Sequence, residues 1–361
     1  MWRNWWLSWT ASLGAVKHDS FVQKHLLKRS WLSYSLYPAS LLYAGYMRWR
    51  RRHLFKNPYR PPFKVISIGN LSLGGSGKSP IAIALAKSLQ QHNLMVAYSS
   101  RGYKSKLENS ATLIYDGRKL MARADVAGDE AVMAAAQLDD VPVFSGKLRG
   151  KVMQLAERYF PHLNVMILDD AFQHLKVARD IDIVVFDSEL GLGNGFVLPA
   201  GYLREGLSAI SPQSICILHQ KPWSRENPEL QARLSATGAS VYEVKSSSGD
   251  ILRKGKRVRV QDLKGKKITL LSAIAHPESF AKSAQMLGLV YQKQLTFPDH
   301  HNFTDPQSLA LLKADDSEYL LCTAKDFVKL SQDFRDKLLL LTMETTLPQE
   351  LIEDILSRLK A

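Results

Sequence analysis

The sequence predicts an α/β protein in which a P-loop-type parallel-sheet domain precedes a second, smaller α/β domain. Short apolar runs rich in β-branched residues alternate with helical segments along the chain, which is typical of a parallel sheet covered by helices on both faces. One of these runs, 65–68, leads directly into a glycine-rich turn and then into an Ala-rich helical stretch. A length of 361 residues with 45% hydrophobic residues is sufficient for two domains with substantial cores.

The glycine-rich turn predicts a phosphate-binding loop, because strand, glycine turn, Lys-Ser and helix is the order of elements that a P-loop requires. Backbone N–H groups and a helix N-terminus surround a phosphate in such a loop, so Lys78 would reach the β- and γ-phosphates and Ser79 would bind Mg²⁺. Ser72 stands where the usual pattern has glycine, and a glycine turn without a ligand is the alternative. The predicted ATP-binding residues are Ser72, Leu73, Gly74, Gly75, Ser76, Gly77, Lys78 and Ser79.

Two acids, Asp169 and Asp170, follow an apolar strand expected at 164–168. After a P-loop such a strand is typical of the Walker B element, whose carboxylate completes the Mg²⁺ shell. Apolar runs that end in acids are common, so this prediction depends on the P-loop. The sequence predicts a metal site made of Ser79 with Asp169 or Asp170, and it leaves open which of the two acids contacts the ion.

Polar residues in other loops are candidates for substrate contacts and proton transfer. Arg101 follows a strand, at the edge of the sheet where ligands bind, although a surface arginine is equally compatible with the pattern. Asp129 stands at the start of an Ala-rich helix, where an ordinary N-cap is the alternative. His300 and His301 lie in one loop, and histidine transfers protons near neutral pH, although surface turn histidines are the alternative.

The chain is expected to divide into three segments. Residues 1–59 form a basic, Trp-rich segment, 60–210 form the P-loop domain, and 211–361 form a second α/β domain that contributes to the active-site cleft. The Asn-Pro and Pro-Pro pairs at 57–62 indicate a stiff linker. No nucleotide motif recurs in the second domain, and its basic run 253–259 is expected to form an exposed hairpin or linker.

The N-terminal segment predicts a helix that contacts an anionic membrane. Residues 1–60 hold eleven Lys and Arg against one acid, and six of the seven Trp. That mixture suits the headgroup zone of a bilayer. Nucleic acid could use the same charge, but no nucleic-acid-binding module is visible, so no nucleic-acid partner is expected. The uncharged stretch 30–47 contains four Ser, four Tyr and Pro38, which favours a helix lying in the interface over a span.

Several motifs together resemble one family, the tetraacyldisaccharide 4′-kinases, which phosphorylate the lipid A precursor of Gram-negative bacteria. The resemblance covers nearly the whole chain beyond the first thirty residues. It depends above all on GGSGKSP, DDAFQH, LREG and DHH, with LYPASLLY, SRGY, GDEA and TAKDFVKL in support. The family often reads TEKD where this chain has Ala324, so no role is expected for that position, and the first thirty residues are not assigned one.

The resemblance implies ATP-dependent transfer of the γ-phosphoryl group to the 4′-hydroxyl of a tetraacyldisaccharide 1-phosphate, at the cytoplasmic face of the inner membrane. It implies a proton acceptor at Asp129 with His300 as its partner, beside the catalytic Lys78. The implied cofactors are ATP and Mg²⁺, and the implied partners are the lipid A disaccharide 1-phosphate precursor and the anionic membrane surface. The candidates for binding the sugar and its 1-phosphate are Arg101, Arg149, Arg204 and Glu205.

Two other functions use the same P-loop. A kinase of a soluble alcohol would retain the loop but would leave the basic N-terminal segment unexplained. A membrane-docked nucleotide switch would need a guanine-reading NKxD motif, which the sequence lacks, since the similar residues 323–326 have the wrong spacing.

Overall fold

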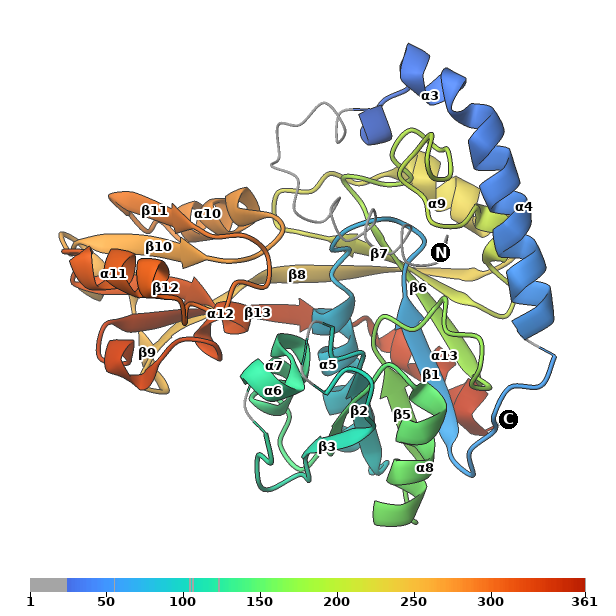
Figure 1. The fold of residues 1–361 in the computed structure, drawn as a ribbon, viewed down its shortest axis with the longest axis horizontal. Helices are drawn as coiled ribbons and strands as arrows, with labels where there is room; N and C mark the ends of the chain where they lie inside the picture. The colour runs from blue at the N-terminus through green and yellow to red at the C-terminus, as the bar shows by residue number, and fades with distance from the viewer. Residues whose placement is uncertain (1–24, 55, 104, 106, 123, 361) are drawn as a thin grey trace. The chain divides into compact units, whose positions relative to one another are not determined.

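Apolar, β-branched runs form the strands of two α/β units in the computed structural model, which describes residues 25–54, 56–103, 105, 107–122 and 124–360 (Figure 1). The larger unit consists of Asp19–Ser246 and Thr345–Ala361, and the smaller one contains Ser247–Glu344. Four of the N-terminal tryptophans, at positions 2, 5, 6 and 9, lie outside the described residues. The mixed α/β fold expected from the sequence is confirmed.

The sheet of the larger unit is parallel apart from one edge strand. Its strands run in the order β8, β7, β6, β1, β5, β2, β4, β3, and only the β3–β4 pair is antiparallel. The bounds are β1 Lys64–Gly69, β2 Val96–Ser100, β3 Thr112–Tyr115, β4 Val143–Ser145, β5 Val165–Leu168, β6 Ile181–Asp187, β7 Ile215–Gln220 and β8 Ser240–Arg253.

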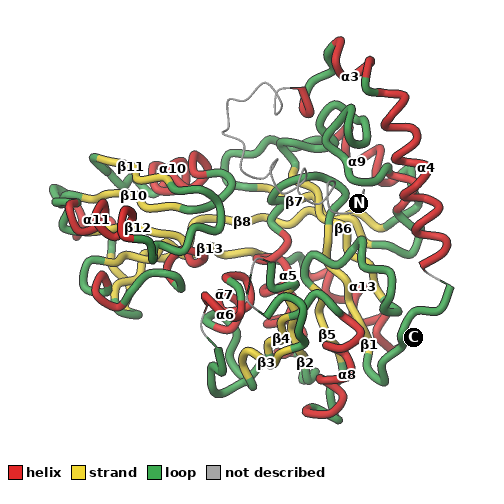
Figure 2. The backbone as a smooth tube through the Cα atoms, viewed as in Figure 1, coloured by secondary structure: helices red, strands yellow, loops and turns green. Residues whose placement is uncertain are grey.

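Helices cover this sheet because its strands are apolar on both faces. Val65, Ala97 and Met166 pack against α8 (Arg149–Tyr159). The helix α5 (Lys78–Gln91) packs against β1, β2 and β5 (Figure 2). The larger unit also contains the helices α6 Ala124–Ala127, α7 Asp129–Ala135, η1 Leu207–Ala209, α9 Pro228–Ser235 and α13 Gln349–Lys360.

The smaller unit contains a parallel sheet in the order β11, β10, β12, β13. Adjacent leucines of β10 alternate between its two faces: Leu270 packs with Phe280 of α10, whereas Leu271 packs with Leu312 of α11. The bounds are β9 Lys256–Val258, η2 Val260–Leu263, β10 Ile268–Ser272, α10 Pro277–Met286, β11 Lys293–Thr296, α11 Pro306–Ala314, β12 Tyr319–Thr323, α12 Ala324–Phe327, η3 Gln332–Phe334 and β13 Leu338–Thr346.

Two helices, α3 (Trp31–Ser35) and α4 (Tyr37–Leu54), precede the sheet and appear in blue in Figure 1. Ser30 caps α3 with a capping box, in which Ser30 and Ser33 each accept the other's backbone N–H. Among the described residues, no helix has the length and apolarity that crossing a membrane requires.

The division between the units differs from the boundary expected at 210/211. Strand β7 and the first half of β8 extend the parallel sheet of the larger unit, and the C-terminal α13 packs there too, with Arg358 donating to Ser240 Oγ at 3.0 Å. The chain therefore leaves the larger unit within β8 and returns within β13. The basic run does form a hairpin, because β8 and β9 pair antiparallel around Lys254 and Gly255, which both have positive φ.

Candidate active site

The phosphate-loop residues lie between the carboxyl end of β1 and the first turn of α5. Gly74 and Gly77 have φ values of 88° and 84°, a left-handed conformation that glycine adopts without strain. Side-chain Nδ2 of Asn70 donates to Ser72 Oγ at 3.2 Å and to the carbonyl of Gly74 at 3.3 Å. The turn thus has two left-handed glycines, and α5 begins at Lys78.

The LPAGYLREG segment packs beside the phosphate loop. The backbone N–H of Leu73 donates to the carbonyl of Tyr202 at 3.0 Å, and that of Arg204 donates to Leu71 at 2.6 Å. These bonds bring Arg204 and Glu205 to the same end of the sheet as Lys78, although more than 120 residues separate them in sequence.

His219, a histidine that the sequence analysis did not single out, packs against Gly77 of the phosphate loop. His219 is 1% exposed at the carboxyl end of β7, and Nε2 lies 2.8 Å from Ser246 Oγ. A Cβ at Gly77 would lie 2.2 Å from His219 Nδ1, so no larger residue fits at position 77 without movement. Burial lowers the pKa of His219 to about 4, and the side chain is therefore neutral at pH 7. Its only signal in the sequence is a histidine that ends an apolar strand.

Asp169 lies directly after β5 and binds the serine that follows the phosphate-loop lysine. Ser79 donates to Asp169 Oδ2 at 2.5 Å, and the buried Tyr98 donates to the same oxygen at 2.6 Å. Burial raises the pKa of Asp169, although the hydrogen bonds from Ser79 and Tyr98 oppose that shift. Tyr98 is a second residue that the sequence did not indicate, because it reads simply as an apolar position of a buried strand.

Asp170 faces cations and has the opposite electrostatic character. Burial alone would raise its pKa, but the positive charges of Lys78, Arg204, Arg101 and Arg149 outweigh burial and lower the pKa to about 2. Lys78 Nζ lies 3.5 Å from Asp170 Oδ1. Asp170 also has a φ of 50°, a conformation that is uncommon outside glycine and asparagine. Two adjacent carboxylates are therefore distinct: Asp169 binds hydroxyls, and Asp170 is paired with Lys78.

The oxygen donors at this site suit a magnesium ion. A serine hydroxyl and a carboxylate in direct contact are hard oxygen ligands, and Mg²⁺ in P-loop proteins takes one or two such ligands, with phosphates and waters completing its octahedron. The described residues contain no cluster of three or more His, Cys, Asp or Glu that could hold a metal by themselves. The donor set therefore fits an ion that is held jointly with a nucleotide.

Arg149 is 1% exposed and binds backbone groups of the neighbouring strands. It donates to Ser99 Oγ at 2.8 Å, to the carbonyl of Ser100, and to the carbonyl of Asp169 at 2.5 Å. Burial lowers its pKa to about 10, so it remains charged at neutral pH. These contacts hold the carboxyl ends of β2 and β5 together, and its predicted role in substrate binding stays a prediction.

The other predicted substrate residues have partners from separate segments. Arg101 lies 3.4 Å from Glu108, which Lys147 also approaches at 3.9 Å. Glu205 is 4% exposed and pairs at 2.9 Å with Arg51 at the end of α4. Asp129 begins α7, is 7% exposed, and follows Gly128, whose φ of 93° suits glycine.

The DHH loop lies in the smaller unit and distinguishes its two histidines. His301 Nε2 contacts Ser308 Oγ in the first turn of α11 at 2.7 Å and Oδ2 of its N-cap, Asp305, at 3.0 Å, and its ring stacks on Phe297. His300 instead lies 3.3 Å from Lys325 Nζ. His301 is therefore bound within its own loop, which supports the prediction of His300 as the functional histidine. Asp129 and His300 belong to different units, and their predicted partnership stays a prediction.

Comparison with known proteins adds independent evidence. The sequence profile of the Tetraacyldisaccharide-1-P 4′-kinase family matches residues 32–360. This chain belongs to that family. The tetraacyldisaccharide 4′-kinase of Desulfotalea psychrophila is 34% identical over 305 residues, which cover 81% of this chain and 87% of that protein. The protein of the same name from Chromobacterium violaceum is 30% identical over 94% of this chain and 98% of its own.

A solved kinase of the family shares the fold. The crystal structure described as the "apo" form of LpxK from Aquifex aeolicus in complex with ATP superposes with a TM-score of 0.75 at 28% identity. The superposition covers 91% of this chain and 99% of the Aquifex aeolicus chain. The sequence-based assignment to the tetraacyldisaccharide 4′-kinase family is thus confirmed.

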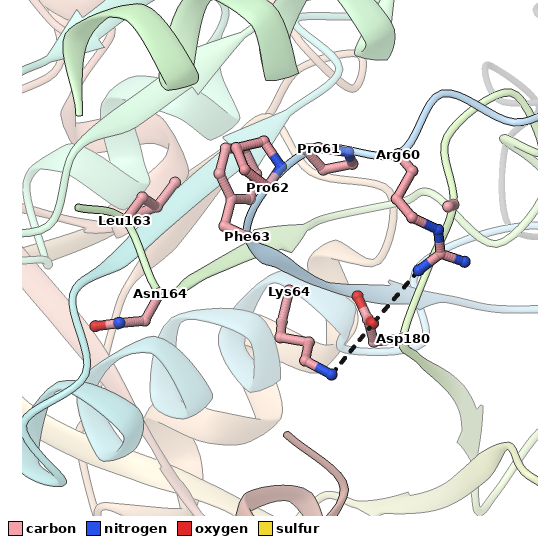
Figure 3. Close-up of a pocket in the computed structure, with 9 residues that line it drawn as sticks. Arg60, Pro61, Pro62, Phe63, Lys64, Leu163, Asn164 and Asp180 are labelled. Atoms are coloured by element: carbon pink, nitrogen blue, oxygen red, sulfur yellow. Dashed lines mark ion pairs between the residues drawn. The ribbon is translucent and has the colours of Figure 1, made fainter. Parts of the chain in front are cut away.

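A cavity of about 290 Å³ lies away from the predicted active site of this kinase (Figure 3). Its lining includes Lys64 and Asn164, which stand at the amino ends of β1 and β5, whereas the phosphate loop follows the carboxyl end of β1. Asp180 lies 3.7 Å from Lys64 and 4.0 Å from Arg60 at this cavity. In parallel sheets ligands bind at the carboxyl ends of strands, so this cavity is not part of the predicted site.

Proposed function

We propose that this chain transfers the γ-phosphoryl group of ATP to the 4′-hydroxyl of a tetraacyldisaccharide 1-phosphate, the precursor of lipid A. The observation that carries the proposal is the arrangement of Lys78, Ser79, Asp169 and Asp170 at the carboxyl ends of β1 and β5, in a chain of this family. A related structure of the family was solved with ATP. Phosphoryl transfer depends mainly on alignment and on neutralising charge, which these residues can provide.

Lys78 and Ser79 act on the nucleotide in this proposal. The amides of the loop and the N-terminus of α5 surround the phosphates, and Lys78 leaves Asp170 to bind the β- and γ-phosphate oxygens. Ser79 and Asp169 would hold Mg²⁺, because they already contact each other at 2.5 Å, whereas Asp170 is the partner of Lys78 only until the phosphates bind. When bound, Mg²⁺ offsets the charge of the phosphates. Tyr98 keeps Asp169 oriented toward Ser79.

Asp129 accepts the proton of the sugar hydroxyl, and His300 assists it. A carboxylate at a helix N-terminus is a weak base, and a neighbouring imidazole can either orient it or share its proton. The product is the 4′-phosphate together with ADP, and Asp129 carries the proton until it passes to solvent. Arg101 and Arg204, whose charges act on Asp170, bind the anionic part of the acceptor or of the nucleotide.

Helix α4 brings the enzyme to the membrane in which its substrate resides. Large apolar side chains on α3 and α4 are exposed: Trp31 76%, Tyr34 57%, Leu41 54%, Leu42 78%, Tyr46 52% and Trp49 55%. Exposed Arg52 lies on the same helix, so an aromatic and aliphatic face is combined with positive charge, as an interfacial helix on anionic lipid requires. A four-chain glycolipid stays in the bilayer, because each buried methylene contributes about 0.8 kcal/mol to its retention. We propose that this membrane is the inner membrane, at its cytoplasmic face, as the family resemblance implies.

The same helix is bound to the predicted active-site loops. Arg51 pairs with Glu205, and Arg50 donates to the carbonyl of Gln173 at 3.3 Å, just after Asp170. Ser40 donates to the carbonyl of Val197 and accepts from Ala200 N–H at 2.9 Å. A surface that inserts into lipid is thus attached rigidly to the segment that contains the LREG motif.

The deciding experiment is incubation of the purified protein with [γ-³²P]ATP, Mg²⁺ and a tetraacyldisaccharide 1-phosphate. A bisphosphorylated lipid labelled at the 4′ position is expected. Transfer to a short-chain sugar phosphate at an equal rate would instead indicate a soluble acceptor. Selective binding of guanine nucleotides without transfer would indicate a nucleotide switch.

Membrane contact is tested by flotation with vesicles of phosphatidylglycerol and phosphatidylethanolamine. Leu42→Glu should weaken binding by about tenfold or more, since an exposed leucine that enters lipid contributes on the order of 1.5–3 kcal/mol. Leu311→Glu is the matched control, because Leu311 is also an exposed helical leucine, at 49%, but lies on α11 in the smaller unit. Equal effects of the two substitutions would contradict the assignment of α4 as the membrane contact.

A further inference from the structure

The TAKDFVKL segment, residues 323–330, has no role in the mechanism above, but it packs against the DHH loop. Thr323 ends β12 and caps the short turn α12, where its hydroxyl contacts Asp326 Oδ2 at 2.8 Å and accepts from Asp326 N–H. Asp326 in turn pairs at 3.0 Å with Lys329, and both side chains are almost fully buried. This turn is therefore fixed to the end of β12, and it presents Lys325 to the DHH loop.

Lys325 contacts two consecutive residues of that loop. Its Nζ lies 2.9 Å from Asp299 Oδ1 and 3.3 Å from His300 Nε2. The side chains are largely withdrawn from water, with exposed fractions of 19% for Lys325, 23% for Asp299 and 14% for His300. The ion pair keeps Asp299 charged: burial alone would raise its pKa, but the positive charge of Lys325 lowers it.

The contact with Lys325 determines which ring nitrogen of His300 carries the proton. An ammonium group has three N–H donors and no lone pair, so a nitrogen that hydrogen-bonds to it must be the acceptor. Nε2 of His300 is that acceptor, and the proton of the neutral ring is therefore on Nδ1.

Asp299 would impose the opposite tautomer if Lys325 were absent. Asp299 Oδ2 lies 3.7 Å from the same Nε2, and a carboxylate accepts but does not donate. Without the ammonium group, this carboxylate would attract a proton to Nε2. Lys325 prevents this by occupying Asp299 and by donating to Nε2.

The backbone conformation of the DHH loop also holds His300 in one position. His300 has a φ of 65° and Phe303 one of 54°, which cost a non-glycine residue free energy on the order of 1 kcal/mol each. The His300 N–H donates to the carbonyl of Ala273 after β10, and Lys329 Nζ lies 5.3 Å from the centre of the Phe303 ring. Residues of the TAKDFVKL segment thus contact both left-handed positions of the loop.

We infer that Lys325 is a positioning residue that holds His300 in the Nδ1–H tautomer. This inference rests on the proposed function, in which His300 assists Asp129, and it decides between the two roles open to the imidazole. With the proton on Nδ1 and Nε2 bonded to Lys325, His300 donates a hydrogen bond that orients a carboxylate and does not take up the acceptor's proton. The proton of the sugar hydroxyl passes to Asp129, the bond from the sugar oxygen to Pγ forms, and the bond from Pγ to the leaving ADP oxygen breaks.

The experiment compares wild type, Lys325→Met and Lys325→Arg, with Lys313→Met as a control at an exposed lysine of α11. Protein labelled with ¹⁵N-histidine is examined by NMR, since a protonated and a bare ring nitrogen have different ¹⁵N chemical shifts. Among the ten histidines, the His300 signal is assigned from its loss in His300→Gln. Wild type, Lys325→Arg and Lys313→Met should have the proton on Nδ1, because guanidinium is also donor-only, and Lys325→Met should have it on Nε2.

Turnover should follow the tautomer. Lys325→Met should lower kcat by about 10- to 100-fold, while the KM for ATP changes by less than about twofold, because the phosphate loop is untouched. Lys325→Arg should recover most of kcat. A wild-type His300 with its proton on Nε2, or a folded Lys325→Met with an unchanged tautomer, would overturn the inference. If Lys325→Met does not fold, the tautomers of wild type and Lys325→Arg still decide. The NMR result stands even if the lipid is not phosphorylated, so the two proposals can fail separately.

Discussion

The phosphate-loop end of the larger unit and the DHH loop of the smaller unit both place acids beside a lysine, but they are built differently. In the larger unit Lys78 begins the helix that follows β1, Asp170 comes soon after β5, and these two strands are neighbours in the sheet. In the smaller unit Asp299 and His300 belong to a loop with left-handed backbone, and their lysine comes from a turn 25 residues later. In the proposed mechanism the first lysine is paired only until a phosphate replaces the carboxylate, whereas the second has a permanent structural partner.

The comparison shows that similar pairs of lysine and aspartate can have different roles. An exchangeable pair keeps a cation ready for a ligand of greater negative charge, and its carboxylate has a pKa of about 2 because several cations surround it. A permanent pair sets the orientation and protonation of a third group. The following predictions test that contrast, beginning with the largest expected effect.

Lys78→Ala should reduce phosphoryl transfer by about 10⁴-fold, because it removes the cation that follows the transferred charge. The assay is transfer of label from [γ-³²P]ATP to the lipid. Tm should change little, since Lys78 makes one ion pair, with Asp170, and the positive charges of three arginines still act on that carboxylate. Lys87→Ala on the outer part of α5 is the control and should be near wild type. Unchanged transfer by Lys78→Ala would remove the phosphate loop from the reaction.

Asp129→Ala should lower kcat by about 10³-fold with little change in ATP affinity, since general-base catalysis contributes 10²–10⁴-fold. His300→Gln should cost less, because an orienting group acts only through the base. In the double variant the losses should not add: it should be about as slow as Asp129→Ala. Steady-state kinetics and ATP binding by calorimetry measure these quantities. Additive losses would show that the two residues act independently.

His219→Gln should make stability less sensitive to acid. The pKa of His219 is about 4 in the folded protein and near 6.5 in the unfolded chain. Between these two values the unfolded chain binds a proton that the folded protein does not. The free energy of unfolding therefore falls as the pH drops from about 6.5 toward 4. This single group accounts for about 2 kcal/mol of the stability lost between pH 7 and pH 5. Urea unfolding at both pH values measures the difference. If His219→Gln loses as much stability as wild type, His219 does not remain neutral beneath the loop.

Arg51→Ala should reduce turnover of the membrane-bound lipid several-fold, on the order of the 3–10-fold expected for one partly buried ion pair. Arg51 attaches α4 to Glu205 and lies 4.6 Å from the centre of the Phe172 ring. Basal ATP hydrolysis should stay near wild type, because the phosphate loop is not touched. Arg257→Ala, at an exposed arginine of β9 in the smaller unit, is the control. Equal losses of lipid turnover and hydrolysis would contradict a role specific to the lipid.

The contrast between the two regions also explains which features could be predicted. The phosphate loop, Lys78 and the acids after β5 were visible because strand, turn and helix are contiguous in sequence, and neighbouring parallel strands bring their carboxyl ends together. Tyr98, His219 and Lys325 were not visible, because each reaches its partner across the fold and its residue type is ordinary where it stands. The boundary at 210/211 was placed too early, since nothing in the apolar pattern of β7 distinguishes it from strands of either unit.

The sequence by itself determined the α/β class and the family, because strand periodicity and contiguous motifs are encoded residue by residue. Only the tertiary structure decided that Asp169 binds Ser79 while Asp170 binds Lys78, and that His300 rather than His301 meets Lys325. Two adjacent residues of the same type have nearly the same sequence neighbourhood, so local sequence does not distinguish them. Their roles diverge only when distant side chains pack against them and set their hydrogen bonds and charge.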